Sequence, residues 1–149
     1  MKNGGFNLNW FKIDKANAVG GRYRIQNQWR ADQYLHMENG GLQSGAIESG
    51  WWSAQWDFEP VGDYVRICNR WRVNACLNIE NGGLQANAVE AGWHSAQWSL
   101  EAVEGRTDLY RIKNRWKPDQ YLHIENGSVE AGAIQDGWLS ARWKLTQAD

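Results

Sequence analysis

A block of just over forty residues occurs three times along this 149-residue chain. Each copy opens with Ile-x-Asn-x-Trp, continues with Leu-x-apolar-Glu-Asn-Gly, and closes with Ser-Ala-Gln-Trp or Ser-Ala-Arg-Trp. The central glutamates, Glu38, Glu80 and Glu125, are 42 and 45 residues apart (80 − 38 = 42, 125 − 80 = 45). Self-similarity at such a period constrains the architecture more than any single residue. It also predicts that a site in one repeat has counterparts in the other two.

Every repeat contains four short segments in which apolar and polar residues alternate between Gly- and Asn-rich sequences. In the first repeat they centre on residues 23–25, 34–38, 46–48 and 54–58. Alternation with a period of two, bounded by turn residues, is typical of β-strands. The pairs Asn39-Gly40, Asn81-Gly82 and Asn126-Gly127 are predicted to be turns, because Asn and Gly tolerate positive φ.

Twelve strands in three equal sets predict an all-β protein with the β-trefoil fold, in which six strands form a barrel and three hairpins cap it. We expect a single domain over residues 1–149, with repeats at about 22–63, 64–108 and 109–149. The alternative is a propeller, but propellers have roughly four to eight blades, so three would close only in an oligomer. An extra strand is predicted at about residues 7–14, lying along the barrel or offering an edge for a homo-oligomer.

The inward positions of the predicted strands define a core that recurs in each repeat. Because Trp56, Trp98 and Trp143 occupy these positions, we expect them to be barrel core and not ligand platforms. The predicted core consists of Ile25, Leu35, Met37, Ile47, Trp56 and Phe58, then Ile67, Leu77, Ile79, Val89, Trp98 and Leu100, then Ile112, Leu122, Ile124, Ile134, Trp143 and Leu145.

Composition excludes several classes of protein. The formal net charge of −1 argues against nucleic-acid binding, which needs a basic face. No run approaches the roughly 18 apolar residues of a membrane span, so membrane insertion is not expected. His36, His94 and His123 lack metal-ligand spacing, and neither a metal nor a cofactor is expected. The start at Met1 shows no signal peptide, which predicts a cytoplasmic protein, or a secreted one if a leader has been trimmed.

Tryptophan is unusually frequent, with 11 residues against 3 phenylalanines. An indole N–H needs a partner when it is buried, so some rings are expected to face water or a ligand. Trp29, Trp71 and Trp116 recur in the loops between the first and second strands, as sugar platforms or as struts against the neighbouring repeat; we favour struts. Trp52 has no counterpart and is a candidate for differences between sites.

The two cysteines lie across the first hairpin of the second repeat. If Ile67 pairs with Leu77, then Cys68 and Cys76 are directly opposite, within about 4.5–5.5 Å. In a cytoplasmic chain we expect free thiols, with a disulfide as the alternative.

Over residues 22–146, this pattern of strands and closing Trp resembles the R-type (ricin B-like) β-trefoil lectins and the related family-thirteen carbohydrate-binding modules. The closing glutamine departs from the family, since it directly precedes Trp56 and Trp98 instead of lying two positions before. The resemblance implies one sugar site per repeat, with an acidic residue, a polar residue, a stacking aromatic and a second polar residue. These roles fall on His36, Asn78 and His123 (acidic position); Glu48, Glu90 and Gln135; Trp51, Trp93 and Trp138; and Ser53, Ser95 and Ser140.

Strand alternation independently points to this face. With Leu35 inward, Tyr34, His36 and Glu38 point outward, and the third repeat presents Tyr121, His123 and Glu125 in the same way. A ring, an imidazole and a carboxylate suit a sugar, since charge-assisted hydrogen bonds contribute about 1.5–3 kcal/mol each. The second repeat presents Cys76, Asn78 and Glu80, so we expect its site to be weaker. The alternative is a solvated polar face.

These observations predict a multivalent carbohydrate-binding protein whose partners are glycans. Catalysis is not expected, because repeat-related glutamates would be farther apart than the roughly 5–10 Å of a glycosidase acid–base pair. The alternative is a protein-binding trefoil of the protease-inhibitor or scaffold type. Such proteins act through single loops that differ between repeats, whereas these loops are nearly identical.

Overall fold

The computed structural model describes residues 20–148, which fold into one sheet of twelve strands and three short 3₁₀ helices. The strand predicted at residues 7–14 lies outside the described residues. The first repeat contains β1 (Gly21–Asn27), β2 (Tyr34–His36), β3 (Gln43–Gly45), η3 (Trp52–Ala54) and β4 (Trp56–Val61). The second contains β5 (Tyr64–Asn69), β6 (Cys76–Asn78), β7 (Gln85–Asn87), η4 (His94–Ala96) and β8 (Trp98–Ala102). The third contains β9 (Leu109–Asn114), β10 (Tyr121–His123), β11 (Glu130–Gly132), η5 (Leu139–Ala141) and β12 (Trp143–Gln147).

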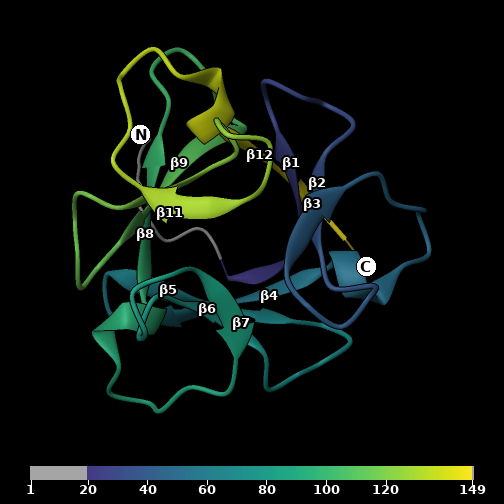
Figure 1. The fold of residues 1–149 in the computed structure, drawn as a ribbon, viewed down its shortest axis with the longest axis vertical. Helices are drawn as coiled ribbons and strands as arrows, with labels where there is room; N and C mark the ends of the chain where they lie inside the picture. The colour runs from purple at the N-terminus through teal and green to yellow at the C-terminus, as the bar shows by residue number, and fades with distance from the viewer. Residues whose placement is uncertain (1–19, 149) are drawn as a thin grey trace, which may run out of the picture.

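Six of the strands close into a ring of antiparallel pairs. The ring runs β1–β4–β5–β8–β9–β12 and returns to β1. The other six form the hairpins β2–β3, β6–β7 and β10–β11 outside the ring. Figure 1 shows the resulting three lobes around a central axis. This is the β-trefoil that the repeats predict, and the propeller alternative is wrong.

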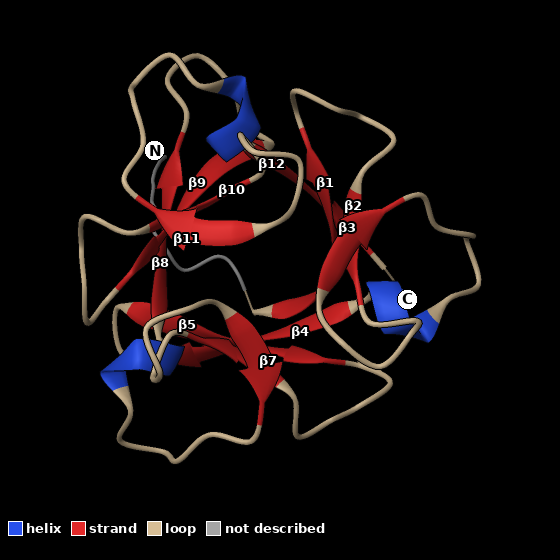
Figure 2. Cartoon of the chain, viewed as in Figure 1, coloured by secondary structure: helices blue, strands red, loops and turns tan. Residues whose placement is uncertain are grey.

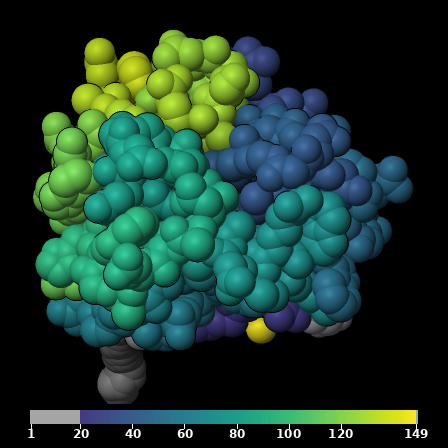
Figure 3. Space-filling model, turned by 60° about the horizontal axis from the view of Figure 1, so that its bottom comes forward, coloured from purple at the N-terminus to yellow at the C-terminus, as the bar shows by residue number. Residues whose placement is uncertain are grey.

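The short 3₁₀ helices η3, η4 and η5 lie at the outer side of the three lobes, one in each (Figure 2). In the space-filling view of Figure 3, the repeats occupy adjoining sectors of one continuous surface. Each repeat therefore has a neighbour on either side, and this contact between repeats shapes the site described below.

The core confirms the predicted role of the closing tryptophans. Trp56, Trp98 and Trp143 are fully buried, and each indole N–H donates to a hairpin carbonyl, that of Leu35, Leu77 and Leu122 respectively, at 3.0 Å. The indole therefore fills the barrel while satisfying its polar atom, as a buried tryptophan must. Isoleucines and leucines from all three repeats complete the cluster.

The third segment of each repeat forms a strand three residues earlier than predicted. In the first repeat, β3 pairs Ser44 with Leu35 and Gln43 with His36. Strand β2 ends at His36, because the next amide, that of Met37, donates to the carbonyl of Ser53 instead of to a hairpin partner. The short hairpin therefore ends before Ile47.

The prediction that Ile47, Val89 and Ile134 belong to the core is consequently wrong, and all three are only half-buried. The residues that pack on the core from this part of the repeats are Leu42, Leu84, Ala86, Val129 and Ala131.

The Asn-Gly turns are confirmed. Gly40, Gly82 and Gly127 have φ near +100° (100°, 98° and 99°), where a side chain is strained, and each amide donates back to the carbonyl three residues earlier. The chain thus reverses directly after each repeat-related glutamate.

The cysteine register is confirmed, but the expectation of free thiols is wrong. Cys68 pairs directly with Cys76 across β5 and β6, and the two sulfurs form a disulfide. Cross-strand neighbours are close enough for this bond without rearrangement of the strands. It ties the barrel to the hairpin of the second repeat.

Candidate functional site

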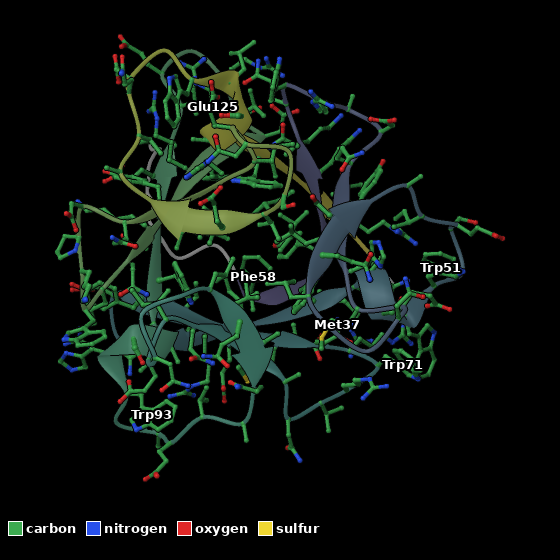
Figure 4. All side chains as sticks on the ribbon, in the orientation of Figure 1. Met37, Trp51, Phe58, Trp71, Trp93 and Glu125 are labelled. Atoms are coloured by element: carbon green, nitrogen blue, oxygen red, sulfur yellow. A yellow bond between two sulfur atoms is a disulfide. The ribbon has the colours of Figure 1, made fainter. Side chains whose placement is uncertain are left out.

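Two clefts on the rim of the trefoil have walls of the same kind. The first, of about 500 Å³, is lined by Glu38, Gly50, Trp51, Trp52, Ser53 and Trp71. The second, of about 340 Å³, is lined by Glu80, Gly92, Trp93, His94, Ser95 and Trp116. Each set combines one carboxylate, one serine and at least two aromatic rings. Figure 4 shows Trp51 and Trp71 beside each other at the periphery, while Trp93 lies at the edge of the next lobe.

The carboxylate of the first cleft is held by the element on which Ser53 lies. The amide of Met37 donates to the Ser53 carbonyl at 3.0 Å, which brings the following residue, Glu38, against η3. The Ser53 hydroxyl then donates to Oε1 of Glu38 at 2.6 Å. The corresponding bonds, Ser95 to Glu80 and Ser140 to Glu125, are 2.5 and 2.6 Å long. The bond from serine to glutamate is therefore present in all three repeats.

The second aromatic wall of each cleft comes from the neighbouring repeat. Trp71 follows β5, yet it lines the cleft of the first repeat, and Trp116 follows β9 and lines the cleft of the second. Trp29, Trp71 and Trp116 are 42–46% exposed, so they do not pack as closed struts alone. Trp71 and Trp116 lie against the preceding repeat, as the predicted struts would, and at the same time form the wall of an open cleft.

One asparagine fixes each of these loops. Asn69 is buried, and its Oδ1 accepts from the amides of Trp71 and Arg72 while its amide nitrogen donates to the Ser53 carbonyl. Asn114 makes the same bonds to Trp116, Lys117 and Ser95. This asparagine therefore connects the loop tryptophan of one repeat to the serine of the previous one.

Equivalent bonds join the loop of the first repeat to the third repeat and so close the threefold arrangement. Asn27 donates to the Ser140 carbonyl at 2.9 Å and accepts from the amide of Trp29. The amide of Gln28 donates to the carbonyl of Arg142. The loop of Trp29 is thus held against the third repeat, at Ser140 and Arg142, by the same kinds of bond that hold the loop of Trp71 against the first.

Cations cover one face of the loop rings. The guanidinium carbons of Arg30 and Arg72 lie 4.4 and 4.8 Å from the ring centres of Trp29 and Trp71, and the Lys117 ammonium lies 4.6 Å from that of Trp116. In the first cleft, Arg70 also lies 3.8 Å over Trp52. Such contacts help to hold exposed rings in place.

A second set of arginines holds the loop before the cleft tryptophan. Arg24, Arg66 and Arg111 donate to the carbonyls of Ser49, Ala91 and Asp136 respectively, at 2.7–3.1 Å. Trp51 follows two residues after the first of these carbonyls. In the first repeat, Arg24 on β1 thus helps to position Trp51 by holding the loop that precedes it.

The prediction that His36 and His123 point outward is wrong. Both are buried, at 5% and 4% exposure, beneath the cleft tryptophan of their own repeat. The ring centres of His36 and Trp51 are 5.6 Å apart, and those of His123 and Trp138 are 5.5 Å apart. Alternation along β2 does not expose this position, because β3 and the Trp51 loop cover it.

Each imidazole supports the backbone of its glutamate. Nδ1 of His36 accepts from the amide of Glu38 at 3.2 Å, and Nδ1 of His123 accepts from that of Glu125 at 3.1 Å. Burial lowers the pKa of His36 below its ordinary value, against the opposing charge of Glu38. Burial likewise lowers the pKa of His123, which Glu130 and Glu125 oppose. Both imidazoles are therefore neutral near pH 7.

Several predicted site residues are not brought to the clefts. Cys76, the counterpart of Tyr34 and Tyr121, lines a different hollow of about 330 Å³ with Glu59 and Arg66. The hydroxyl of Tyr121 instead donates to Glu101. Glu48, Glu90 and Gln135 are exposed in the preceding loop, where their carbonyls accept from the amides of Trp51, Trp93 and Trp138.

The prediction that the second repeat has the weakest sugar site therefore has no basis in the residues that line the clefts. That ranking rested on the missing aromatic at Cys76, which lies elsewhere. Sequence reasoning also did not assign Trp71, Trp116 and Trp29 to the sites. The available signal was a tryptophan repeated three times in a loop of a chain with more tryptophan than its core requires.

Within residues 20–148, no three His, Cys, Asp or Glu side chains are grouped to hold a metal ion. In the same part of the chain, no helix has the length and apolar character needed to cross a membrane.

Solved structures with this fold include sugar-binding and sugar-cleaving proteins, although no protein-family model and no curated protein matches the sequence. A GlcNAcα1-4Gal-releasing endo-β-galactosidase from Clostridium perfringens matches with a TM-score of 0.77 and 29% identity, over 86% of this chain and 32% of that one. This chain thus spans about a third of that enzyme.

Two smaller proteins match along their whole length. SeviL, solved with the asialo-GM1 saccharide, has a TM-score of 0.72 and 21% identity, over 88% of this chain and 100% of that one. The designed threefold-symmetric ThreeFoil has a TM-score of 0.72 and 19% identity, over 86% and 99%. The predicted resemblance to ricin B-like β-trefoil lectins and carbohydrate-binding modules is therefore confirmed at the level of structure.

Proposed function

We propose that this protein binds carbohydrate through its rim clefts and holds glycans without altering them. The observation that carries the proposal is the repeated cleft itself, in which a serine-bound glutamate faces tryptophans from two repeats. The structural likeness to SeviL, which was solved with a saccharide, and to part of an endo-β-galactosidase supports the same class of ligand.

The chemistry of the walls suits a sugar ring. The C–H face of a pyranose is apolar and stacks on indole, while its hydroxyls donate to carboxylate oxygens. In the first cleft, Ser53 occupies Oε1 of Glu38, which leaves Oε2 to accept from a ligand hydroxyl. Charge-assisted bonds of this kind contribute about 1.5–3 kcal/mol each.

The same walls argue against hydrolysis. Glycoside hydrolysis needs two carboxylates about 5–10 Å apart on either side of the scissile bond. The lining of the first cleft contains one, Glu38, and that of the second contains one, Glu80. Binding at several clefts would instead act through avidity, which raises apparent affinity by roughly 10²–10⁴ when a polysaccharide engages more than one site.

The test begins with a glycan array that includes the asialo-GM1 saccharide, followed by calorimetric titration of the glycans that bind. A triple variant, Glu38→Gln with Glu80→Gln and Glu125→Gln, is expected to weaken each site about tenfold, since each loses the charge from one hydrogen bond. The matched control, Asp63→Asn with Glu104→Gln and Asp119→Asn, removes three charges from exposed positions outside the clefts. Equal binding by the triple variant and the control would contradict the assignment of the clefts.

A further inference from the structure

The position beneath the cleft tryptophan differs between repeats in a paired manner. In repeats one and three, the imidazoles of His36 and His123 lie beside Gly45 and Gly132. In repeat two, Asn78 lies beside Asn87. A Cβ added at Gly45 or Gly132 would lie 3.2 Å from Nε2 of the neighbouring histidine. The glycine is therefore the residue that leaves room for an imidazole.

In repeat two, both members of the pair change together. Asn78 is shorter than histidine, and the side chain of Asn87 accepts from its amide nitrogen at 2.6 Å. Oδ1 of Asn78 accepts from the amide of Glu80 at 3.1 Å. Asparagine thus makes the same bond to the glutamate backbone that Nδ1 of histidine makes in the other repeats, but it does not titrate.

The histidine bond exists only for a neutral ring. Nδ1 must have a free lone pair to accept from the amide of Glu38, so the proton of the neutral imidazole is on Nε2. A second proton on Nδ1 would face the Glu38 amide, placing two donors against each other in a buried position. The protonated ring must therefore leave, and it lies directly under Trp51.

We propose that His36 and His123 are positioning residues that hold Glu38 and Glu125, and the tryptophan beside each imidazole, in place only while neutral, so that acid opens the first cleft and loosens the corresponding residues of the third repeat but spares the second cleft. The effect on glycan binding rests on the function proposed above, whereas the opening itself does not. The first and second clefts of one molecule thus differ in their response to acid, because a histidine supports the glutamate of the first and an asparagine that of the second.

The charges around each histidine define the expected range of pH. Glu38 faces His36, and Glu125 and Glu130 face His123; these carboxylates favour the cation and partly oppose burial. Gln43 and Gly45 on β3 and Trp51, which also lie next to His36, carry no charge. Because burial lowers the folded pKa, the stabilisation is complete above a pH of about 6.5 and declines below it.

The first test needs no ligand. In ¹⁵N-resolved NMR spectra of the whole protein between pH 7.5 and 5.0, the amide protons of Glu38 and Glu125 are expected to shift as their hydrogen bond is lost. The amide of Glu80 donates to Asn78, which does not titrate, and its signal is expected to stay nearly constant. Constant Glu38 and Glu125 signals, or an equal shift of Glu80, would overturn the inference.

The second test uses the asialo-GM1 saccharide and variants that each keep one cleft. Glu80→Gln with Glu125→Gln keeps the first cleft, and its affinity is expected to fall by up to about tenfold from pH 7.5 to 5.5, the protonation ratio of a free imidazole. Glu38→Gln with Glu125→Gln keeps the second cleft and should change little. If the saccharide fails to bind at pH 7.5, that result counts against the proposed function, and the amide shifts alone decide the role of the histidines.

Exchanging the pairs separates positioning from general stability. His36→Asn with Gly45→Asn should make the first cleft resistant to acid while preserving binding at pH 7.5. The converse exchange, Asn78→His with Asn87→Gly, should make the second cleft sensitive. If the exchanged variants keep their original pH profiles, the histidines do not position the clefts.

Discussion

Two sets of three tryptophans occupy opposite environments in this protein. Trp56, Trp98 and Trp143 are fully buried in the barrel, whereas Trp29, Trp71 and Trp116 are 42–46% exposed at the rim. Both sets recur in every repeat, so recurrence does not distinguish them. The two sets differ in the hydrogen bonds that hold them in place. The indole N–H of each inner ring donates to the carbonyl of a hairpin leucine. The outer rings instead have their loop backbone fixed by an asparagine.

The comparison teaches that one residue type performs two tasks in a small domain. The inner tryptophan joins barrel to hairpin within a repeat. The outer tryptophan joins one repeat to the cleft of the previous one. Stability and binding are therefore expected to respond to different substitutions, and three predictions test this separation.

The largest effect is expected from Trp98→Ala. This substitution leaves a cavity in the barrel and removes the donor to the Leu77 carbonyl, so the free energy of unfolding should fall by roughly 3–5 kcal/mol. Urea denaturation followed by circular dichroism measures the change. The paired control is Trp116→Ala, expected to alter stability by only about 0.5 kcal/mol. Similar losses in the two variants would remove the distinction between inner and outer rings.

An intermediate effect is expected from Asn69→Ala, because this buried side chain connects the two regions. It bonds the amides of Trp71 and Arg72 and the carbonyl of Ser53, and its loss leaves buried polar groups without partners. The cost should be about 1–3 kcal/mol of unfolding free energy, together with weaker binding at the first cleft. Asn69→Asp keeps the acceptor and should retain the loop better. A stable Asn69→Ala variant with unchanged tryptophan fluorescence would contradict this role.

The smallest expected effect on free energy is that of Trp71→Ala on glycan affinity. Removing one stacking wall should cost about 0.5–1.5 kcal/mol of binding at the first cleft. The measurement is calorimetric titration in the variant that retains only this cleft, with Trp29→Ala in the same background as control because the loop of Trp29 is bonded to the third repeat and not to the first cleft. Equal losses from the two substitutions would show that the rings do not serve separate clefts.

The fold could be predicted because its evidence is local and repeated. Three copies of four alternating segments leave few closed arrangements, and the inner tryptophans follow from the alternation of the last strand. The position of β3 could not be obtained in this way, because Met37 forms its backbone bond with Ser53, which is distant in sequence. Alternation therefore extended β2 by two residues and moved the next strand toward Ile47.

The site was predictable only in part for the same reason. Glu38, Trp51 and Ser53 can be predicted as members of one site because all three belong to the same repeat. Trp71 was not assigned to this cleft because it belongs to the next repeat, and nothing in the local pattern reports contacts between repeats. The burial of His36 depends on the loop that folds over it, which a count of alternating positions does not include.

Because each cleft is lined by residues of two repeats, the number of clefts depends on the number of junctions between repeats. A solitary repeat carries two unmatched halves, and a chain of two repeats completes one junction. Only when the third repeat meets the first, through the bonds from Asn27 to Ser140 and from Gln28 to Arg142, does the number of junctions equal the number of repeats. Closure of the threefold ring therefore completes two junctions at once, the one between the second and third repeats and the one between the third and first.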